Sequence, residues 1–273
     1  MVAYYTEKFL IIVEGNYIIQ KVVFVLERLQ PHIKCRKGQV NPSVLLPGDL
    51  DRADYIANNF FQNSKNISEN KEYRIYNGEY SGKPVAVCPT GIGAVSSAVI
   101  LEELIEAGAR YFIRVGSCGA LTKNLKPGDI VIATGAVRGE GTSKEYIDVR
   151  FPAFADFSVT GALARAAKQR NVPFNEGIIR THDAFYIESP MAHGNYKERI
   201  KVWNKAGVLA IENESATLFV VGALKHVRVG TILVVAGNLA TFTKTNTEKV
   251  KDSIDKAINI SCDALVMLQE VEQ

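Results

Sequence analysis

Runs of apolar residues alternate along the chain with stretches in which apolar positions recur every three or four residues. The first pattern predicts buried strands, and the second predicts helices with one buried face. The predicted strands lie at 43–49, 72–91 (two strands, with a Gly/Asn turn and a Ser-Gly-Lys-Pro turn), 111–117, 129–137, 175–186 (strand, then loop) and 229–239. The predicted helices lie at 52–60, 94–109, 158–172, 214–227 and 247–271.

Local signals refine these elements. Gly108 is expected to end the helix before it, and Ser158 or Thr160 to cap the next one. The segment 138–157 is expected to be irregular.

Helices that alternate with β-branched apolar runs are typical of an α/β layered fold around a largely buried sheet. Because no linker, repeat or low-complexity tract interrupts the pattern, we predict a single domain at 31–273 after an extension at 1–30.

The extension contains the apolar stretch "FLIIVEGNYIIQKVVFVL" at 9–26. Glu14, Asn16, Gln20 and Lys21 interrupt it, so no uncharged run reaches the roughly 20 residues that a membrane helix needs. A basic start and a cleavage site, which mark a signal peptide, are not evident. We therefore predict no membrane association, and a helix or strand that packs on the body or on a partner chain.

Composition narrows the function classes. With 273 residues and 47% hydrophobic content, the chain can bury a sizeable core. The net charge of +3 comes from 32 basic and 29 acidic residues that are interspersed, which suits small anionic substrates and not a nucleic acid. The four cysteines form no CxxC pair, which disfavours disulfides and zinc and favours a reducing cytoplasm.

Arg114 lies inside the apolar run 111–117, where a buried guanidinium needs an anion to answer it. One interpretation is an internal salt bridge with Asp or Glu. The other is a phosphate held by Arg52, Arg114, the hydroxyl of Ser117 and backbone amides, because a guanidinium binds phosphate through two hydrogen bonds.

Glycine turns at strand ends add a weaker signal. Gly48 follows a predicted strand, and Gly91 and Gly93 precede a helix, where backbone N–H groups meet anions. The chain has neither a GK[ST] P-loop nor a complete GxGxxG, which disfavours ATP and NAD.

Two carboxylates, Glu212 and Glu214, precede and enter a hydrophobic helix. One interpretation is a helix start that Ser215 helps to cap. Alternatively, two carboxylates separated by one residue can hold vicinal sugar hydroxyls.

Eight blocks in order, among them "LLPGDLDR", "FIRVGSCGAL", "GDIVIATGAVRGEGTSKEY", "FPAFADF" and "ENESATLF", closely resemble the nucleoside phosphorylase family. This family includes uridine phosphorylase, to which the likeness is greatest, and the hexameric purine nucleoside phosphorylases. The resemblance runs from about His32 to the C-terminal helix. It implies a three-layer α/β/α sandwich with a mixed, barrel-like central sheet, and a homo-hexamer of dimers with shared active sites.

The resemblance also implies roles for individual residues. Phosphate would be bound by Gly48, Arg52, Arg114 and Ser117, with Lys71 from the neighbouring subunit in place of an Arg. Ribose would be bound by Glu212, Asn213 (in place of a Met), Glu214 and a partner's His32. The base would be bound by Phe185, Tyr186, Ser189, Met191 and Asn238.

The implied reaction is reversible phosphorolysis of a nucleoside to a free base and (deoxy)ribose 1-phosphate, with inorganic phosphate as co-substrate and no cofactor or metal. Arg114, Glu214 and Asn238 would act on the reacting groups, the last by stabilising the departing base.

Departures from the family pattern leave the base open. Ser189 and Met191 stand where uridine phosphorylases usually have Gln and Arg, and Asn238 stands where the purine enzymes usually have Asp. A 6-oxopurine nucleoside is therefore the alternative substrate. A nucleosidase and a catalytically silent nucleoside-binding protein are the rival functions, and a serine or thiol hydrolase is disfavoured because no GxSxG motif occurs.

Overall fold

The computed structural model describes residues 7–14, 17–25, 28–186, 193–243 and 247–271. Strands β1 (Glu7–Glu14) and β2 (Tyr17–Val25) pair with each other in antiparallel fashion and form a sheet of their own. The strand alternative predicted for the N-terminal extension is therefore confirmed. Its packing on the body or on a partner chain stays a prediction.

The body is built on one large mixed sheet with the strand order β11-β10-β8-β12-β7-β3-β6-β5-β4. Its strands are β3 (Ser43–Pro47), β4 (Gln62–Asn70), β5 (Tyr73–Tyr80), β6 (Lys83–Val87), β7 (Tyr111–Ala120), β8 (Ile130–Arg138), β9 (Ala153–Phe154, paired with β8), β10 (Asn175–Thr181), β11 (Ala210–Glu212) and β12 (Arg228–Asn238). Strand β11 pairs with β10 on one side and antiparallel with β7 on the other. Strands β7, β12, β8, β10 and β11 thus close into a barrel, as the family resemblance predicts.

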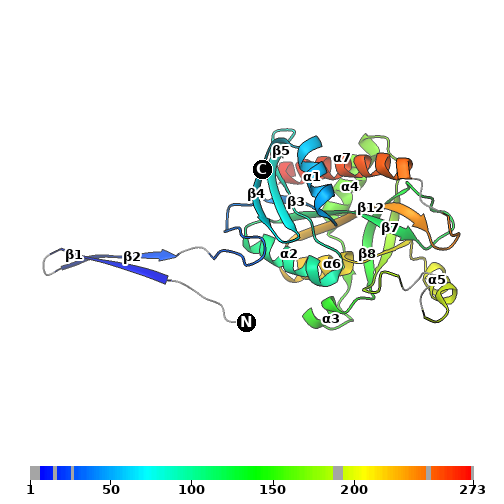
Figure 1. Cartoon of the computed structure of the whole chain (residues 1–273), viewed down its shortest axis with the longest axis horizontal. Helices are drawn as coiled ribbons and strands as arrows, with labels where there is room; N and C mark the ends of the chain where they lie inside the picture. Colours follow the sequence, from blue (N-terminus) through cyan, green and yellow to red (C-terminus); the bar gives the residue numbers. More distant parts are fainter. Residues whose placement is uncertain (1–6, 15–16, 26–27, 187–192, 244–246, 272–273) are drawn as a thin grey trace.

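Helices cover both faces of the sheet. They are α1 (Leu50–Asn59), α2 (Ala94–Glu106), α3 (Thr142–Tyr146), α4 (Phe157–Gln169), α5 (Tyr196–Lys205), α6 (Ser215–Leu224) and α7 (Thr247–Val271). Figure 1 shows α1, α4 and α7 on one side of the sheet and α2 and α6 on the other. The predicted α/β/α sandwich is confirmed.

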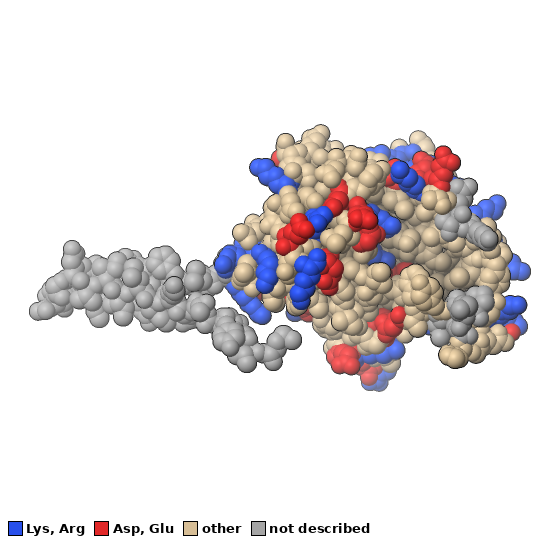
Figure 2. Space-filling view, viewed as in Figure 1, with Lys and Arg blue, Asp and Glu red and all other residues tan. Residues whose placement is uncertain are grey.

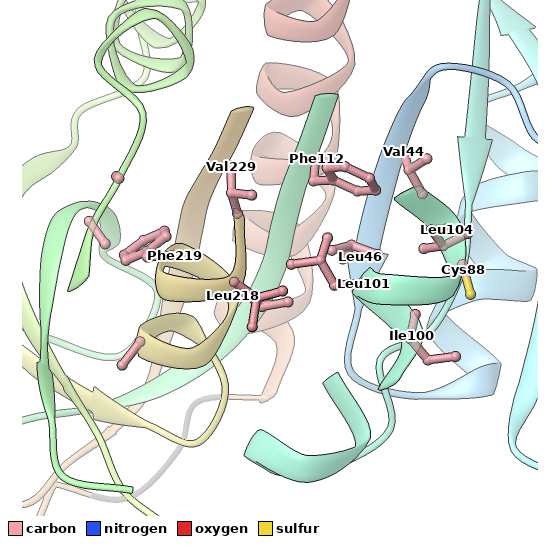
Figure 3. Close-up of a cluster of buried hydrophobic side chains, with 14 of the residues drawn as sticks. Val44, Leu46, Cys88, Ile100, Leu101, Leu104, Phe112, Leu218, Phe219 and Val229 are labelled. Carbon is pink, nitrogen blue, oxygen red and sulfur yellow. The ribbon is translucent and has the colours of Figure 1, made fainter. Parts of the chain in front are cut away.

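Each face has its own hydrophobic core. Under α2 and α6, side chains such as Leu101, Leu218 and Phe219 pack against Leu46 of β3 and Phe112 of β7 (Figure 3). A second cluster fills the space between the sheet and α1, α4 and α7. Because β3 and β7 are buried on both faces, their ends are held rigidly where the site forms.

The main differences from the predicted elements are in polar segments. Strand β4 and helix α5 have no counterpart in the prediction, and the segment expected to be irregular contains the short α3 and β9. The predicted Asn-Gly turn is wrong, because Gly78 lies within β5, where an added Cβ would be 2.9 Å from Cβ of Phe61. The predicted caps of α4 are also wrong: Asp156 caps it by accepting from the Val159 amide at 3.0 Å.

The surface carries both signs of charge. Figure 2 shows Lys and Arg interspersed with Asp and Glu on the face that it presents. In the described part of the chain, no helix combines the length and the apolar character that crossing a bilayer requires. Over the same residues, no group of three or more His, Cys, Asp and Glu side chains gathers as a metal site.

Candidate active site

The strand ends meet around a cavity of about 180 Å³. Gly48 follows β3, Arg114 and Ser117 lie on β7, and Glu212 ends β11. The residues that line this cavity, here called the anion cavity, include Gly48, Arg52, Arg114, Ser117, Phe185, Glu212, Asn213 and Glu214. The structure therefore brings together all four residues predicted to bind phosphate within one chain and three of those predicted to bind ribose.

Arg52 reaches this cavity from the first turn of α1. Asp49 caps the helix by accepting from the Arg52 amide at 2.8 Å, and its carboxylate lies 3.7 Å from the Arg52 guanidinium. Burial lowers the pKa of Arg52, and the charge of Arg114 lowers it further, against the opposing effect of Asp49. Two guanidinium groups that repel each other across a cavity favour an anion between them.

Arg114 is 4% exposed and forms ion pairs with both glutamates. Its Nε donates to Oε2 of Glu212 at 3.0 Å, and its Nη2 lies 2.5 Å from Oε2 of Glu214. Burial opposes the charge, but the two carboxylates outweigh it and raise the pKa of Arg114. Of the two interpretations of Arg114, the internal salt bridge is thus present in the structure. The remaining nitrogen, Nη1, is buried and has no hydrogen-bond partner among the described residues.

Gly116 makes the position of Arg114 possible. The two residues lie on the same side of β7, and a Cβ added to Gly116 would be 2.8 Å from Nη2 and 2.9 Å from Cζ of Arg114. A side chain at this position would occupy the space that the guanidinium fills.

The carboxylate of Glu212 is occupied by hydrogen-bond donors of the protein itself. Its two carboxylate oxygens accept from the Arg114 guanidinium, the Thr181 hydroxyl at 2.5 Å, the Glu214 and Ser215 amides, and the Ser215 hydroxyl at 2.9 Å. The carboxylate thus satisfies the first amides of α6, a task that the sequence analysis gave to Ser215. No acceptor position is left on Glu212 for a sugar hydroxyl, so its assignment as a direct ribose ligand is not supported by this geometry.

Glu214 has fewer partners and faces the anion cavity. Its Oε1 accepts from the Gly93 amide at 2.7 Å, at the start of α2. The anion met by this glycine turn is therefore Glu214. Burial raises the pKa of Glu214, with Glu212 adding to the effect and Arg114 and the Gly93 amide opposing it.

A second cavity of about 400 Å³, here called the base cavity, adjoins the first. The two share Ser117, Phe185, Glu212 and Asn213. The second also contains Cys118, whose pKa burial raises far above its usual range, so this thiol is not an activated nucleophile.

Asn238 lines the base cavity, but the hydrogen-bonding groups of its side chain are all used within the protein. Its Nδ2 donates to the carbonyls of Thr122 at 2.8 Å and Leu125 at 2.6 Å, and its Oδ1 accepts from the amides of Ala240 and Thr241. An Asn side chain offers two donors and one carbonyl oxygen, and all are used here. The structure gives Asn238 the role of holding the cavity wall, in place of the predicted direct contact with the base.

His182 lines the base cavity and was missed by the sequence analysis. It directly follows β10 and is 5% exposed. A lone histidine next to a strand carries no sequence signal of its own, and only the closure of the barrel brings it beside Glu212 and Asn213.

The other predicted residues lie elsewhere in the single chain. His32 pairs with Glu103 through Nδ1 at 2.6 Å, and the exposed Lys71 lies in the turn between β4 and β5. Asn70 donates to the His32 carbonyl at 2.7 Å, so these two predicted partner-facing residues lie on one edge of the body. Tyr186 is 73% exposed and stacks edge-on with Phe185. Ser189 and Met191 are outside the described residues.

Known proteins share this architecture and sequence. Residues 42–268 match the family model described as the phosphorylase superfamily. The chain is 39% identical over 246 residues to the guanosine phosphorylase of Halorubrum lacusprofundi, which covers 88% of this chain and 99% of that protein. It is 39% identical over 241 residues to the uridine phosphorylase of Treponema pallidum, covering 87% and 93% respectively. The crystal structure of uridine phosphorylase from Vibrio fischeri ES114 matches with a TM-score of 0.81 at 33% identity, over 89% of this chain and 100% of that chain.

The chain therefore belongs to the phosphorylase superfamily. Within it, the chain is a nucleoside phosphorylase, and hence a pentosyltransferase, which confirms the family predicted from the sequence.

Proposed function

We propose that the two adjoining cavities form one active site, in which inorganic phosphate attacks the anomeric carbon of a nucleoside. Phosphate binds in the anion cavity between Arg52 and Arg114, the base binds in the base cavity, and the ribose lies between them. The observation that carries this proposal is that one cavity is lined by Arg52, Glu214 and Arg114, and that the buried Nη1 of Arg114 has no hydrogen-bond partner among the described residues.

The reaction follows from this placement. The bond from the anomeric carbon to the base breaks with its electron pair on the base, while a phosphate oxygen forms the new bond. The sugar acquires oxocarbenium character, which the phosphate anion below it stabilises. Glu214 accepts hydrogen bonds from the ribose hydroxyls and orients the sugar. No step requires a covalent enzyme intermediate.

Uridine is the first candidate substrate, and a 6-oxopurine nucleoside is the alternative. The two relatives described above share the same sequence identity with the chain, 39%. One is named a guanosine phosphorylase and the other a uridine phosphorylase. We also propose that the active site is completed by His32 and Lys71 of a second copy within a hexamer of dimers. The four free, buried cysteines are compatible with a cytoplasmic enzyme.

The decisive experiment measures base release from uridine, thymidine, inosine, guanosine and methylthioadenosine, with and without phosphate. Phosphate-dependent release with formation of the sugar 1-phosphate is expected. Equal release without phosphate would identify a nucleosidase, and tight nucleoside binding without turnover would identify a silent binding protein.

Variants connect the activity to the anion cavity. Arg114→Ala is expected to abolish phosphate saturation. Because it also leaves two buried carboxylates without their partner, Arg52→Ala serves as the second variant. Among the described residues, the Arg52 guanidinium has only a longer ion pair, to Asp49, so its loss should raise the KM for phosphate about 10- to 100-fold while the fold is retained.

Shared active sites are testable by mixing. A variant with Arg52→Ala and a variant with Lys71→Ala should each have low activity. If sites are shared, co-assembled mixtures contain some sites with neither substitution and regain activity; no gain in demonstrably mixed oligomers would count against sharing.

A further inference from the structure

We propose that a third cavity, next to the base cavity, binds a small organic anion with a flat apolar ring, here called a ring anion, and that the bound ring anion weakens nucleoside binding. This cavity of about 380 Å³, here called the lysine cavity, is lined by Lys123, Lys197 and Lys201 together with apolar residues that include Leu239 and Phe242. Its volume lies within the range of small-molecule sites, roughly 300–1,000 Å³. The phosphorolysis proposed above does not use it.

The three segments around the lysine cavity are joined to one another by hydrogen bonds. Asn204 of α5 donates through Nδ2 to the carbonyl of Leu121, directly after β7, at 2.7 Å. The amide of Leu239, directly after β12, donates to the carbonyl of Ala120 at the end of β7, at 2.9 Å. The cavity is therefore a fixed feature of the fold, and its side chains stand on supported backbone.

The lysines concentrate positive charge at this cavity. Lys197 and Lys201 lie four residues apart and hence on one face of α5, and Lys123 comes from the turn after β7. Among the described residues, no Asp or Glu lines the cavity, and Lys201 alone of the three has an ion pair, with the exposed Glu198 at 3.6 Å. Three ammonium groups on one cavity attract an anion and offer it hydrogen-bond donors.

The apolar side of the cavity favours a ring as the rest of the ligand. Ile200 is 5% exposed and packs with Leu239 in one hydrophobic cluster. Phe242 is 50% exposed and lies edge-on to Tyr196, with the ring centroids 5.9 Å apart. Its backbone has a φ of +56°, a left-handed conformation that an aromatic residue rarely adopts and that marks functional positions. A half-exposed aromatic ring held in this way offers a packing surface to the ring of a ligand.

Two side chains connect the lysine cavity to the proposed active site. Leu239 and Phe242 line the base cavity as well, whereas no described residue lines both the lysine cavity and the anion cavity. Because a ring anion and a base would need contact with the same two side chains, each should weaken the binding of the other, and this coupling is reciprocal. Phosphate binding should be unaffected. This part of the inference rests on the proposed function.

Calorimetry on the whole protein tests the binding. The probes are indole-3-acetate and phenyl phosphate, which carry a carboxylate and a phosphate on a ring. The controls are indole-3-acetamide, which has the ring without the charge, and acetate, which has the charge without the ring. A ring anion is expected to bind at least about 10-fold more tightly than either control, because it alone uses both the lysines and the apolar side. Binding of only one ring anion would identify the anionic group.

The double variant Lys123→Gln/Lys197→Gln shows where the ring anion binds. Both side chains are exposed and neither forms an ion pair with another described residue, so the fold should be retained. The Kd of the ring anion should rise about 10- to 100-fold. Lys126→Gln/Lys205→Gln is the matched control, because it removes two exposed lysines from the same two segments and neither lines the cavity. Its Kd should change less than about 2-fold.

Two results would overturn the site. One is that the wild type binds no ring anion more tightly than the controls. The other is that the two double variants weaken binding equally, which would mean that only the overall charge of the surface matters. Thermal unfolding of both variants, with cooperative transitions expected, shows that the comparison is made on folded protein.

Steady-state kinetics tests the action on the base cavity. With a saturating ring anion, the KM for the nucleoside should rise about 3-fold or more while the KM for phosphate stays unchanged, and Lys123→Gln/Lys197→Gln should not respond at the same concentration. An unchanged KM for the nucleoside would overturn this action. A rise in the KM for phosphate alone would show that the ring anion binds in the anion cavity instead. If the wild type has no phosphate-dependent turnover, the proposed function fails, and the Kd values still decide whether the lysine cavity binds ring anions.

Discussion

Nη2 of Arg114 lies 2.5 Å from Oε2 of Glu214, so the guanidinium proposed to bind phosphate and the carboxylate proposed to hold the sugar form one ion pair. Glu212 stands behind this pair, bonded to Nε of Arg114 and to the amide of Glu214. The two glutamates, although only two residues apart, therefore have different tasks. Glu212 positions both partners, and Glu214 remains available to a substrate.

Substituting each glutamate by glutamine should separate these tasks. Glu212→Gln removes the charge that answers Arg114 and places an amide N–H₂ among groups that donate to Glu212, and should lower the free energy of unfolding by about 3 kcal/mol or more. Glu214→Gln keeps Arg114 paired with Glu212 and should cost about 1 kcal/mol or less, while kcat/KM falls about 10²-fold or more. Urea unfolding and steady-state kinetics on both variants provide the measurement. The reverse order of stabilities would contradict the assignment.

Gly116 should be required for phosphate binding although it offers no side chain. The added methyl group in Gly116→Ala would be 2.8 Å from Nη2 of Arg114 and 3.0 Å from Leu233, so the guanidinium must move. We expect the KM for phosphate to rise about 10-fold or more, as for the loss of a charged hydrogen bond.

Gly161→Ala is the matched control for this substitution. Gly161 lies in α4, and a Cβ added there meets nothing within 4 Å. Its phosphate kinetics should equal those of the wild type, with stability raised by about 0.5–1 kcal/mol because alanine favours a helix. A wild-type KM for phosphate in Gly116→Ala would show that the position of Arg114 does not matter.

The sequence predicts the parts of this site that lie at strand ends. Gly48, Arg114 and Ser117 each follow or lie within an apolar run, and a parallel arrangement of such runs brings their ends together. The unpredicted strand β4 has the opposite character, because the segment "QNSKNISEN" is polar and lies at the sheet edge. Helix α5 is different: Tyr196, Ile200 and Trp203 recur at helical spacing and pack in one cluster, so the sequence carries a signal for this short helix that the prediction did not use.

The hydrogen-bond partners of a side chain are harder to predict from the sequence than the position of its residue in the fold. From the sequence, Glu212 and Asn238 look like binding residues, because carboxylates and amides are the groups that bind sugars and bases. Glu212 is also bonded to the side chains of Arg114 and Thr181, and Asn238 to the carbonyls of Thr122 and Leu125. These partners come from distant segments and are known only when the chain is folded. His182 is the converse case, since its neighbours in the base cavity come from other strands.

Asn238→Asp tests whether Asn238 holds the cavity wall. An ionised Asp has no donor, so one carboxylate oxygen would face the carbonyls of Thr122 and Leu125. The free energy of unfolding near pH 7 should fall by about 2–4 kcal/mol. Protonation of the Asp restores one donor, so the difference from the wild type should shrink as the pH is lowered. Chemical denaturation at several pH values gives this comparison, and an unchanged stability at neutral pH would contradict it.

His182 should also make stability depend on pH. Its pKa is lowered to about 4 in the folded protein, whereas in the unfolded chain it returns to about 6.5. As the pH falls below 6.5, the unfolded chain binds a proton that the folded chain does not, so the free energy of unfolding decreases down to about pH 4. A shift of this size corresponds to about 3 kcal/mol at most.

His182→Asn removes this contribution, and the carboxylates common to both proteins cancel when the two curves are subtracted. Parallel curves for the wild type and His182→Asn between pH 7 and pH 4 would mean that the imidazole is charged, or already hydrated, in the folded protein.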